Sequence, residues 1–223
     1  MAENPISVKT IKELVYEYLK EQIRKKEILP GESINLDKTA KKLGVSRTPL
    51  REALIKLESE GFVKIIPHKG IFVNKLTKKD IKNFYQIVGA LEAEAIIIAY
   101  PKLKDYHITL LKEFTEKMKE AYRIKDYPLY HTNNFKFHDL FPTLAENEYL
   151  KEIVDNIKKR LYDFTISMEG MEEWGKISVE DHETFIKLLQ DGKATEAADF
   201  WKNVHWSFER QEKFINMYYF LEE

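Results

Sequence analysis

The chain has 223 residues, and its 36 lysines and arginines against 37 aspartates and glutamates give a formal net charge of −1. That balance argues against a wholesale polyanion binder such as a histone-like protein, and the absence of cysteine excludes disulfide scaffolds, Cys-ligated zinc and thiol catalysis. No stretch approaches 18 uncharged apolar residues, and the first ten residues lack the basic-then-apolar run of a signal peptide. We therefore expect a cytoplasmic protein with no membrane partner.

Helices are expected first at about 9–26 and then, in a shorter piece, near 37–43. Gly44 follows the second helix in the position where a left-handed backbone closes a helix at little cost. Ser46 is expected to cap a third helix, which stops at Gly61.

Two β-branched and aromatic runs, 62–66 and 71–73, flank His68-Lys69-Gly70 and predict a hairpin. The order helix, short helix, tight turn, capped helix and hairpin is that of a winged helix-turn-helix. Residues 1–75 are therefore expected to form a DNA-binding domain.

A major groove admits one α-helix, which must present hydrogen-bond donors near its N-terminus. Arg47 and Arg51 lie one turn apart on the predicted third helix, opposite its apolar stripe. Hydroxyls and helix N-terminal amides suit phosphate oxygens, and His68 and Lys69 at the hairpin tip can enter an adjacent groove. The expected DNA contacts are Ser46, Arg47, Thr48, Arg51, His68, Lys69 and Gly70.

The charges are unevenly distributed along the chain. Residues 1–75 hold 15 Lys+Arg and 10 Asp+Glu, a net of +5, whereas residues 76–223 hold 21 and 27, a net of −6. The first part is therefore expected to hold DNA and the second to repel it.

From Thr77 onward only helices are expected, and Thr77 with Asp80 resembles a capping box. The first of these helices runs from about Ile81 and ends at Pro101. The later ones are expected near 105–124, 127–144, 148–168, 179–190 and 194–220, with breaks at Pro128, Pro142, Gly170, Gly175 and Gly192. The fold class is mostly α, with an all-helical bundle over 76–223.

Three segments of the first domain carry a family resemblance. Leu29-Pro-Gly-Glu, then Leu43-Gly-Val-Ser-Arg-Thr-Pro-Leu-Arg-Glu-Ala-Leu and Leu57-Glu-Ser-Glu-Gly resemble the DNA-binding domain of the GntR family of bacterial transcriptional regulators. The resemblance implies that Arg47, Thr48 and Arg51 read or clamp an operator, and that Lys69-Gly70 enters the minor groove. One departure is Ser33, where the family often carries an arginine.

The rest of the chain resembles the FadR subgroup, whose FCD effector domains have six or seven helices. The matching segments are Leu91-Glu92-Ala93-Glu94-Ala95, Asn147-Glu148-Tyr149-Leu150 and Asp181-His182-Glu183. This resemblance implies a homodimer bound to a pseudo-palindromic double-stranded operator, with repression as the commoner outcome. It also implies a small-molecule effector, such as an organic acid, that binds in the bundle and alters operator affinity.

Many FCD domains bind a divalent metal through an aspartate, a histidine four residues later and two further histidines. Here His138 and His182 occupy the first two histidine positions, His205 is closest to the third with an offset of about one residue, and Asn134 replaces the aspartate. Neutral imidazoles suit Zn²⁺ or Ni²⁺, and an i,i+4 pair places two ligands on one helical face. His131, one heptad before His138, is an alternative ligand, although a surface position is expected for it.

The effector-binding residues are unknown from the sequence. Many relatives carry an arginine one turn before the glutamate of the first effector-domain helix, and this chain has Val88 there. An acidic effector would then need the metal or another cation, such as Arg123 or Arg160.

The sequence bears on two other functions. A helical metalloenzyme is disfavoured because Ile186 replaces the second histidine of an HExxH pattern. The residues three positions before the histidines also supply no Glu-x-x-His, since they are Phe135, Val179 and Lys202. We therefore expect no enzyme. A DNA-binding protein without an effector, whose bundle only dimerises, stays open.

Overall fold

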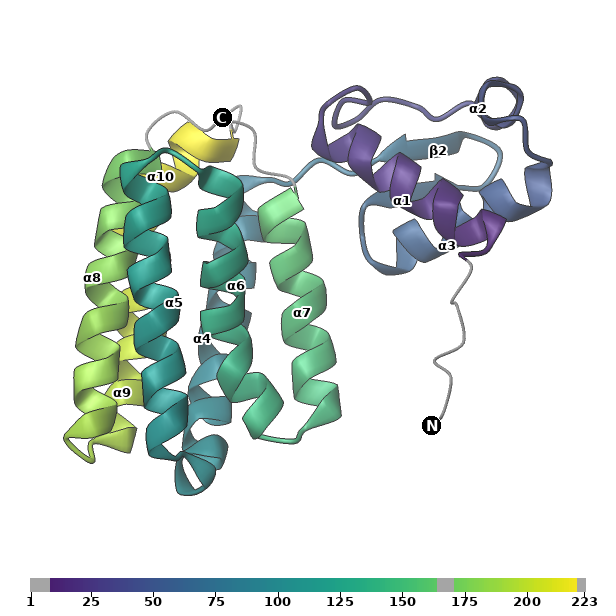
Figure 1. The fold of residues 1–223 in the computed structure, drawn as a ribbon. Helices are drawn as coiled ribbons and strands as arrows, with labels where there is room; N and C mark the ends of the chain where they lie inside the picture. Colours follow the sequence, from purple (N-terminus) through teal and green to yellow (C-terminus); the bar gives the residue numbers. More distant parts are fainter. Residues whose placement is uncertain (1–8, 164–170, 220–223) are drawn as a thin grey trace. The chain divides into compact units, whose positions relative to one another are not determined.

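The computed structural model describes residues 9–163 and 171–219. The chain separates into two compact units, the first ending at Leu76 and the second beginning at Thr77. The first unit holds a helix-turn-helix with a two-stranded wing, and the second is a helical bundle (Figure 1). The predicted fold class is confirmed.

The first unit contains the elements α1 (Ile11–Arg24), α2 (Leu36–Leu43), α3 (Arg47–Ser59), β1 (Val63–Ile66) and β2 (Gly70–Val73). A capping box of Thr10 and Glu13 starts α1, and Gly44 ends α2 with φ 64°, as its position after the second helix predicts. Helix α1 packs on α3. The fully buried contacts of this small core come from Leu19, Leu50, Leu54, Leu57 and Phe62.

The wing is an antiparallel pair with Val63 opposite Val73 and Ile66 opposite Gly70. Its tip is tight: the Lys69 N–H donates to the carbonyl of Ile66 at 3.0 Å. The side-chain amide of Asn74, just after β2, donates to the carbonyls of Gly61 at 2.7 Å and Val63 at 3.2 Å. These bonds fasten the end of the wing to its start.

The second unit begins with the capping box of Thr77 and Asp80, as predicted. Helix α5 lies between α6 and α8, and α4 packs against α6 (Figure 1). Among the described helices, none is both long and apolar enough to cross a membrane. The elements are α4 (Lys78–Ala99), a 3-10 turn (Tyr100–Lys102), α5 (Asp105–Arg123), α6 (Tyr127–Leu144), α7 (Glu148–Asp163), α8 (Met171–Gln190), α9 (Ala194–Phe200), a π-helical turn (Trp201–His205) and α10 (Phe208–Tyr219).

Several predicted breaks were wrong. Gly175 lies inside α8, which starts eight residues before the predicted 179. A Cβ at Gly175 would lie 3.3 Å from the ring of Tyr122, so this glycine allows close packing and does not break the helix. Pro142 also lies inside its helix. The predicted helix 194–220 is interrupted by the π-helical turn. Gly170 and the predicted ends near 168 and 220 lie outside the described residues.

Candidate DNA-binding face and metal centre

Helix α3 presents its polar face to solvent. Arg47, Thr48 and Arg51 are exposed in its first turns, and the Arg47 side chain is 74% exposed. The opposite face, with Leu50 and Leu54, is fully buried. The donors therefore stand where a major groove would receive them.

Ser46 occupies the N-cap position of α3 with extended backbone angles, but its side chain makes no capping hydrogen bond. The predicted capping bond is therefore absent, and the exposed hydroxyl is available to an outside acceptor. At the wing tip His68, Lys69 and Gly70 are exposed. His68 and Gly70 have positive φ values of 60° and 122°, which only the sharp turn at this point requires.

Three histidines converge inside the bundle. His138 on α6, His182 on α8 and His205 in the π-helical turn are all buried, and one ligand atom from each lies within 4.8 Å of the others. Asn134 lies one turn before His138 on α6 and is also buried. The sequence prediction thus named three side chains that the fold brings together. His131 is not a member of this histidine trio.

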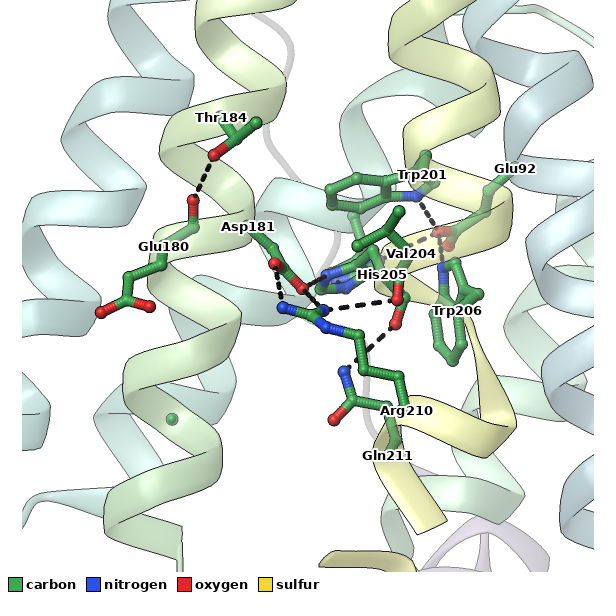
Figure 2. Close-up of polar contacts among 12 residues, drawn as sticks. Glu92, Glu180, Asp181, Thr184, Trp201, Val204, His205, Trp206, Arg210 and Gln211 are labelled. Atoms are coloured by element: carbon green, nitrogen blue, oxygen red, sulfur yellow. Dashed lines mark hydrogen bonds and ion pairs between the residues drawn. The ribbon is translucent and has the colours of Figure 1, made fainter.

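Two carboxylates orient two of the histidines. His138 Nδ1 lies 3.0 Å from a Glu92 oxygen, and His205 Nδ1 lies 3.2 Å from an Asp181 oxygen (Figure 2). Since an ionised carboxylate only accepts, each Nδ1 carries the proton and each Nε2 keeps a lone pair. The two Nε2 atoms face each other at 3.2 Å, and two facing lone pairs need a proton or a cation between them.

His182 completes the donor set. Both its ring nitrogens are buried without a hydrogen-bond partner in the described part of the chain, while its ring stacks on Phe137 with centroids 3.9 Å apart. A buried polar group without a partner is costly. A divalent cation bound by the histidine trio would take one of these two nitrogens as a ligand and so reduce that cost, which is why the residues present fit a metal.

Burial favours the neutral form of His138 and His182. It lowers the pKa of His138 to about 4, although Glu92 acts in the opposite direction, and it lowers the pKa of His182 well below its usual value. Neutral imidazole is the form that ligates metal. His138 and His182 can therefore bind a cation at neutral pH without first losing protons.

Glu92 on α4 is almost fully buried and accepts four hydrogen bonds. Besides His138, its donors are the indole N–H groups of Trp201 and Trp206, each at 2.8 Å, and the ammonium group of Lys158 at 3.0 Å (Figure 2 shows the two indoles). Burial alone would raise the pKa of Glu92, but Lys158, His138 and Trp201 together hold it below its usual value. The carboxylate is thus held ionised.

Asp181 on α8 is held in the same manner. Arg210 on α10 donates to both of its oxygens, at 2.6 and 2.8 Å (Figure 2). Each orienting carboxylate is therefore neutralised by its own cation, and neither leaves net negative charge beside the histidine trio.

The π-helical turn places His205. The Trp206 N–H donates to the carbonyl of Trp201 at 2.9 Å, an i to i+5 bond. Such a turn holds one residue more than an α-helical turn and is frequent at functional sites.

Sequence reasoning missed the residues around the trio. Glu92 and Asp181 entered only as parts of a family pattern, and no signal marked Lys158 or Arg210, because a charged residue on an amphipathic helix normally faces water. Lys158 is nevertheless fully buried.

The two arginines proposed as effector anchors lie elsewhere in the described structure. Arg123 pairs with Glu120 at the surface, and the guanidinium of Arg160 lies 4.5 Å from the centre of the Phe84 ring. Val88 is fully buried.

A winged helix-turn-helix joined to a helical bundle with a buried histidine trio defines the class of DNA-binding transcriptional regulators. Residues 11–73 match the model of the bacterial regulatory proteins of the gntR family, and residues 83–204 match the FCD domain. The chain belongs to the GntR family and carries an FCD domain after its DNA-binding domain. These families and the relatives consist of regulators, which confirms that this is not an enzyme.

Among its relatives is the Nta operon transcriptional regulator of Aminobacter aminovorans, 33% identical over 77% of this chain and 80% of that protein. The gluconate operon transcriptional repressor of Bacillus licheniformis is 27% identical over 80% and 74%. The solved structure of Escherichia coli McbR/YncC has the same fold, with a TM-score of 0.67 and 22% identity over 94% of this chain and 97% of that one.

Proposed function

We propose that this regulator binds a pseudo-palindromic operator as a homodimer and represses transcription. In this proposal residues 1–75 read the DNA, and residues 76–223 dimerise and bind a small-molecule effector, an organic acid, together with a divalent metal. The observation that carries the proposal is the buried histidine trio in a bundle attached to a winged helix-turn-helix. The names of relatives that are repressors support the direction of regulation.

The proposed operator contacts lie on α3 and the wing. Arg47 and Arg51 would pair with base edges or phosphates in the major groove, while Ser46, Thr48 and the first amides of α3 would bind phosphates. His68, Lys69 and Gly70 would enter the adjacent minor groove. The net charge of +5 over residues 1–75 supports this assignment.

The test of the DNA face uses Arg47→Ala and Arg51→Ala. Each substitution should weaken operator binding by about 1–3 kcal/mol, measured by fluorescence anisotropy on DNA sites enriched by the wild-type chain from a random library. Arg24→Ala is the matched control, because Arg24 is an exposed α1 arginine that pairs with Glu21. Full affinity in both α3 variants would refute the assignment.

His138, His182 and His205 would hold the proposed metal, with Asn134 as a fourth, neutral ligand. Zn²⁺ and Ni²⁺ suit an all-nitrogen histidine set with an amide oxygen. When bound, the ion would supply a positive centre that accepts a carboxylate oxygen of the effector. The protein supplies no anionic ligand among these four, so the positive charge stays available to an acidic molecule.

The test of the metal uses protein treated with a chelator. Added Zn²⁺ or Ni²⁺ should raise the melting temperature, since ligand at a hundredfold excess over its Kd stabilises by about 2.7 kcal/mol. His182→Ala should abolish the shift, whereas His107→Ala, a buried histidine on α5 outside the trio, should retain it. A wild-type chain that neither retains metal nor is stabilised would defeat the metal proposal.

Exposed apolar side chains on α4 and α7 support the homodimer. Ile87 and Ile97 on α4 and Tyr149 and Ile153 on α7 are between 39% and 82% exposed, and a second copy would bury them. Ile87→Glu should give a monomer by light scattering, whereas Ile124→Glu at the end of α5 should not.

A further inference from the structure

An ion pair joins α3, the proposed recognition helix, to α2 at the end of α3 that would enter the major groove. Arg47, the first residue of α3, lies with a terminal guanidinium nitrogen 2.5 Å from a carboxylate oxygen of Asp37. Asp37 belongs to the first turn of α2. The pair therefore spans the two helices of the helix-turn-helix, and both side chains are exposed, by 74% and 65%.

Asp37, in the first turn of α2, suits the positive end of that helix, whereas the position of Arg47 does not stabilise the free protein. A cation at the first residue of a helix meets the positive end of the helix dipole, and an exposed ion pair adds little stability. An exposed carboxylate beside a proposed phosphate-binding helix N-terminus also repels DNA. Asp37 therefore opposes generic DNA binding directly, and the ion pair gives it a second route through Arg47.

The geometry leaves Arg47 able to read a base while it stays paired. A guanidinium has five N–H donors in a fixed plane. Asp37 is close to one terminal nitrogen, and the remaining donors suffice for the two bonds that guanine O6 and N7 accept. A side chain tied at one corner has fewer orientations to lose when it binds.

We infer that Asp37 is a specificity-determining residue that positions Arg47 for a guanine and competes with phosphates for its charge. The inference rests on the proposed role of Arg47 as an operator contact. On a matching site the ion pair is kept and the base is read. On random DNA, the Asp37 carboxylate competes with phosphate oxygens for the charge of Arg47, so such binding is weakened.

The experiment compares the full-length wild type with Asp37→Asn, Arg47→Ala and the double variant. The probes are DNA sites enriched by the wild type from a random library and random duplexes of equal length, each titrated over a range of salt concentrations. Glu17→Gln is the matched control. It removes one carboxylate on α1 and breaks one exposed ion pair, the one that Glu17 forms with Lys9. Thermal melting verifies that every variant folds.

For Asp37→Asn we expect tighter binding to random DNA, with a salt slope steeper by about 0.9 because one more phosphate is contacted. The ratio of enriched-site to random-site affinity should fall by roughly fivefold or more, the discrimination of one bidentate contact. In the Arg47→Ala background, Asp37→Asn should leave this ratio unchanged.

Other results overturn the inference. If Asp37→Asn alters neither the salt slope nor the ratio, or acts equally with and without Arg47, then Asp37 does not act through Arg47. If Arg47→Ala alone leaves enriched-site affinity intact, the proposed operator contact fails, and the inference fails with it. The Arg47→Ala measurement thus separates the two failures.

Discussion

At the scale of the residue, proton positions decide what the histidine trio can do. His138 and His205 each donate Nδ1–H to a carboxylate, and the lone pairs that remain point inward. A helical pattern alone gives an i,i+4 spacing of Asn134 and His138, but it does not give the tautomer. The tautomer follows from Glu92 and Asp181, on two other elements.

The buried neutral state of His138 predicts an acid-sensitive fold in the absence of metal. Its folded pKa of about 4 lies below the ordinary value near 6.5, so the unfolded chain binds more protons between these values. The contribution of His138 to the free energy of unfolding is therefore fully present above pH 6.5 and is lost as the pH falls toward 4. From pH 7 to pH 5, His138 alone should cost roughly 2 kcal/mol of unfolding free energy.

Urea denaturation with chelator present measures this cost. His138→Gln should show a shallower decline between pH 7 and pH 5 than the wild type, because glutamine does not titrate. Equal pH dependence in the two proteins would show that His138 is not held neutral by burial.

At the scale of the element, the register between α4 and the π-helical turn depends on a glycine. A Cβ at Gly89 would lie 2.9 Å from the Cβ of Trp206 and 3.5 Å from the carbonyl of Lys202. Neither atom is the end of a flexible side chain. Any larger residue must push the turn away from α4, and with it His205.

Gly89→Ala should therefore destabilise the protein by about 1–3 kcal/mol through overpacking and reduce the thermal shift produced by Zn²⁺. Ala90→Ser, at the next and exposed position of α4, is the control. A Gly89→Ala protein with wild-type stability and an unchanged Zn²⁺ shift would show that the turn tolerates displacement.

The elements of the first unit could be predicted because each boundary has a local chemical cause. Gly44 and the glycine turn of the wing act within a few residues, as does the Thr77 capping box that opens the second unit. The break at Gly175 failed because that glycine serves packing against α5, and packing between distant segments leaves no local signal. The π-helical turn was not predicted for the same reason.

Among single residues, too, some could be predicted from the sequence and others could not. His138, His182 and His205 could be named from the family resemblance, and the fold brings them together. Lys158 and Arg210 could not be named, because only the assembled bundle shows that these cations face Glu92 and Asp181.

At the scale of the whole molecule, the near-zero total charge conceals two oppositely charged parts, +5 over residues 1–75 and −6 over residues 76–223. If metal binding in the bundle alters operator affinity, the operator must alter metal affinity by the same factor.

We expect that factor to lie between about 5 and 150. It is measured by operator titrations with and without Zn²⁺, and by Zn²⁺ titrations with and without operator. His182→Ala should remove the effect of Zn²⁺ in the first titration. Metal binding that leaves operator affinity unaltered would show that the metal is structural rather than regulatory.

Only four residues, 74–77, join the last strand of the wing to α4. Asn74 is bonded back to the wing and Thr77 is bonded into the first turn of α4. Even fully extended, four residues span about 14 Å. In the proposed dimer, this short tether limits how far apart the two reading helices can move. The operator should therefore tolerate little variation in half-site spacing, and a longer tether should relax that limit.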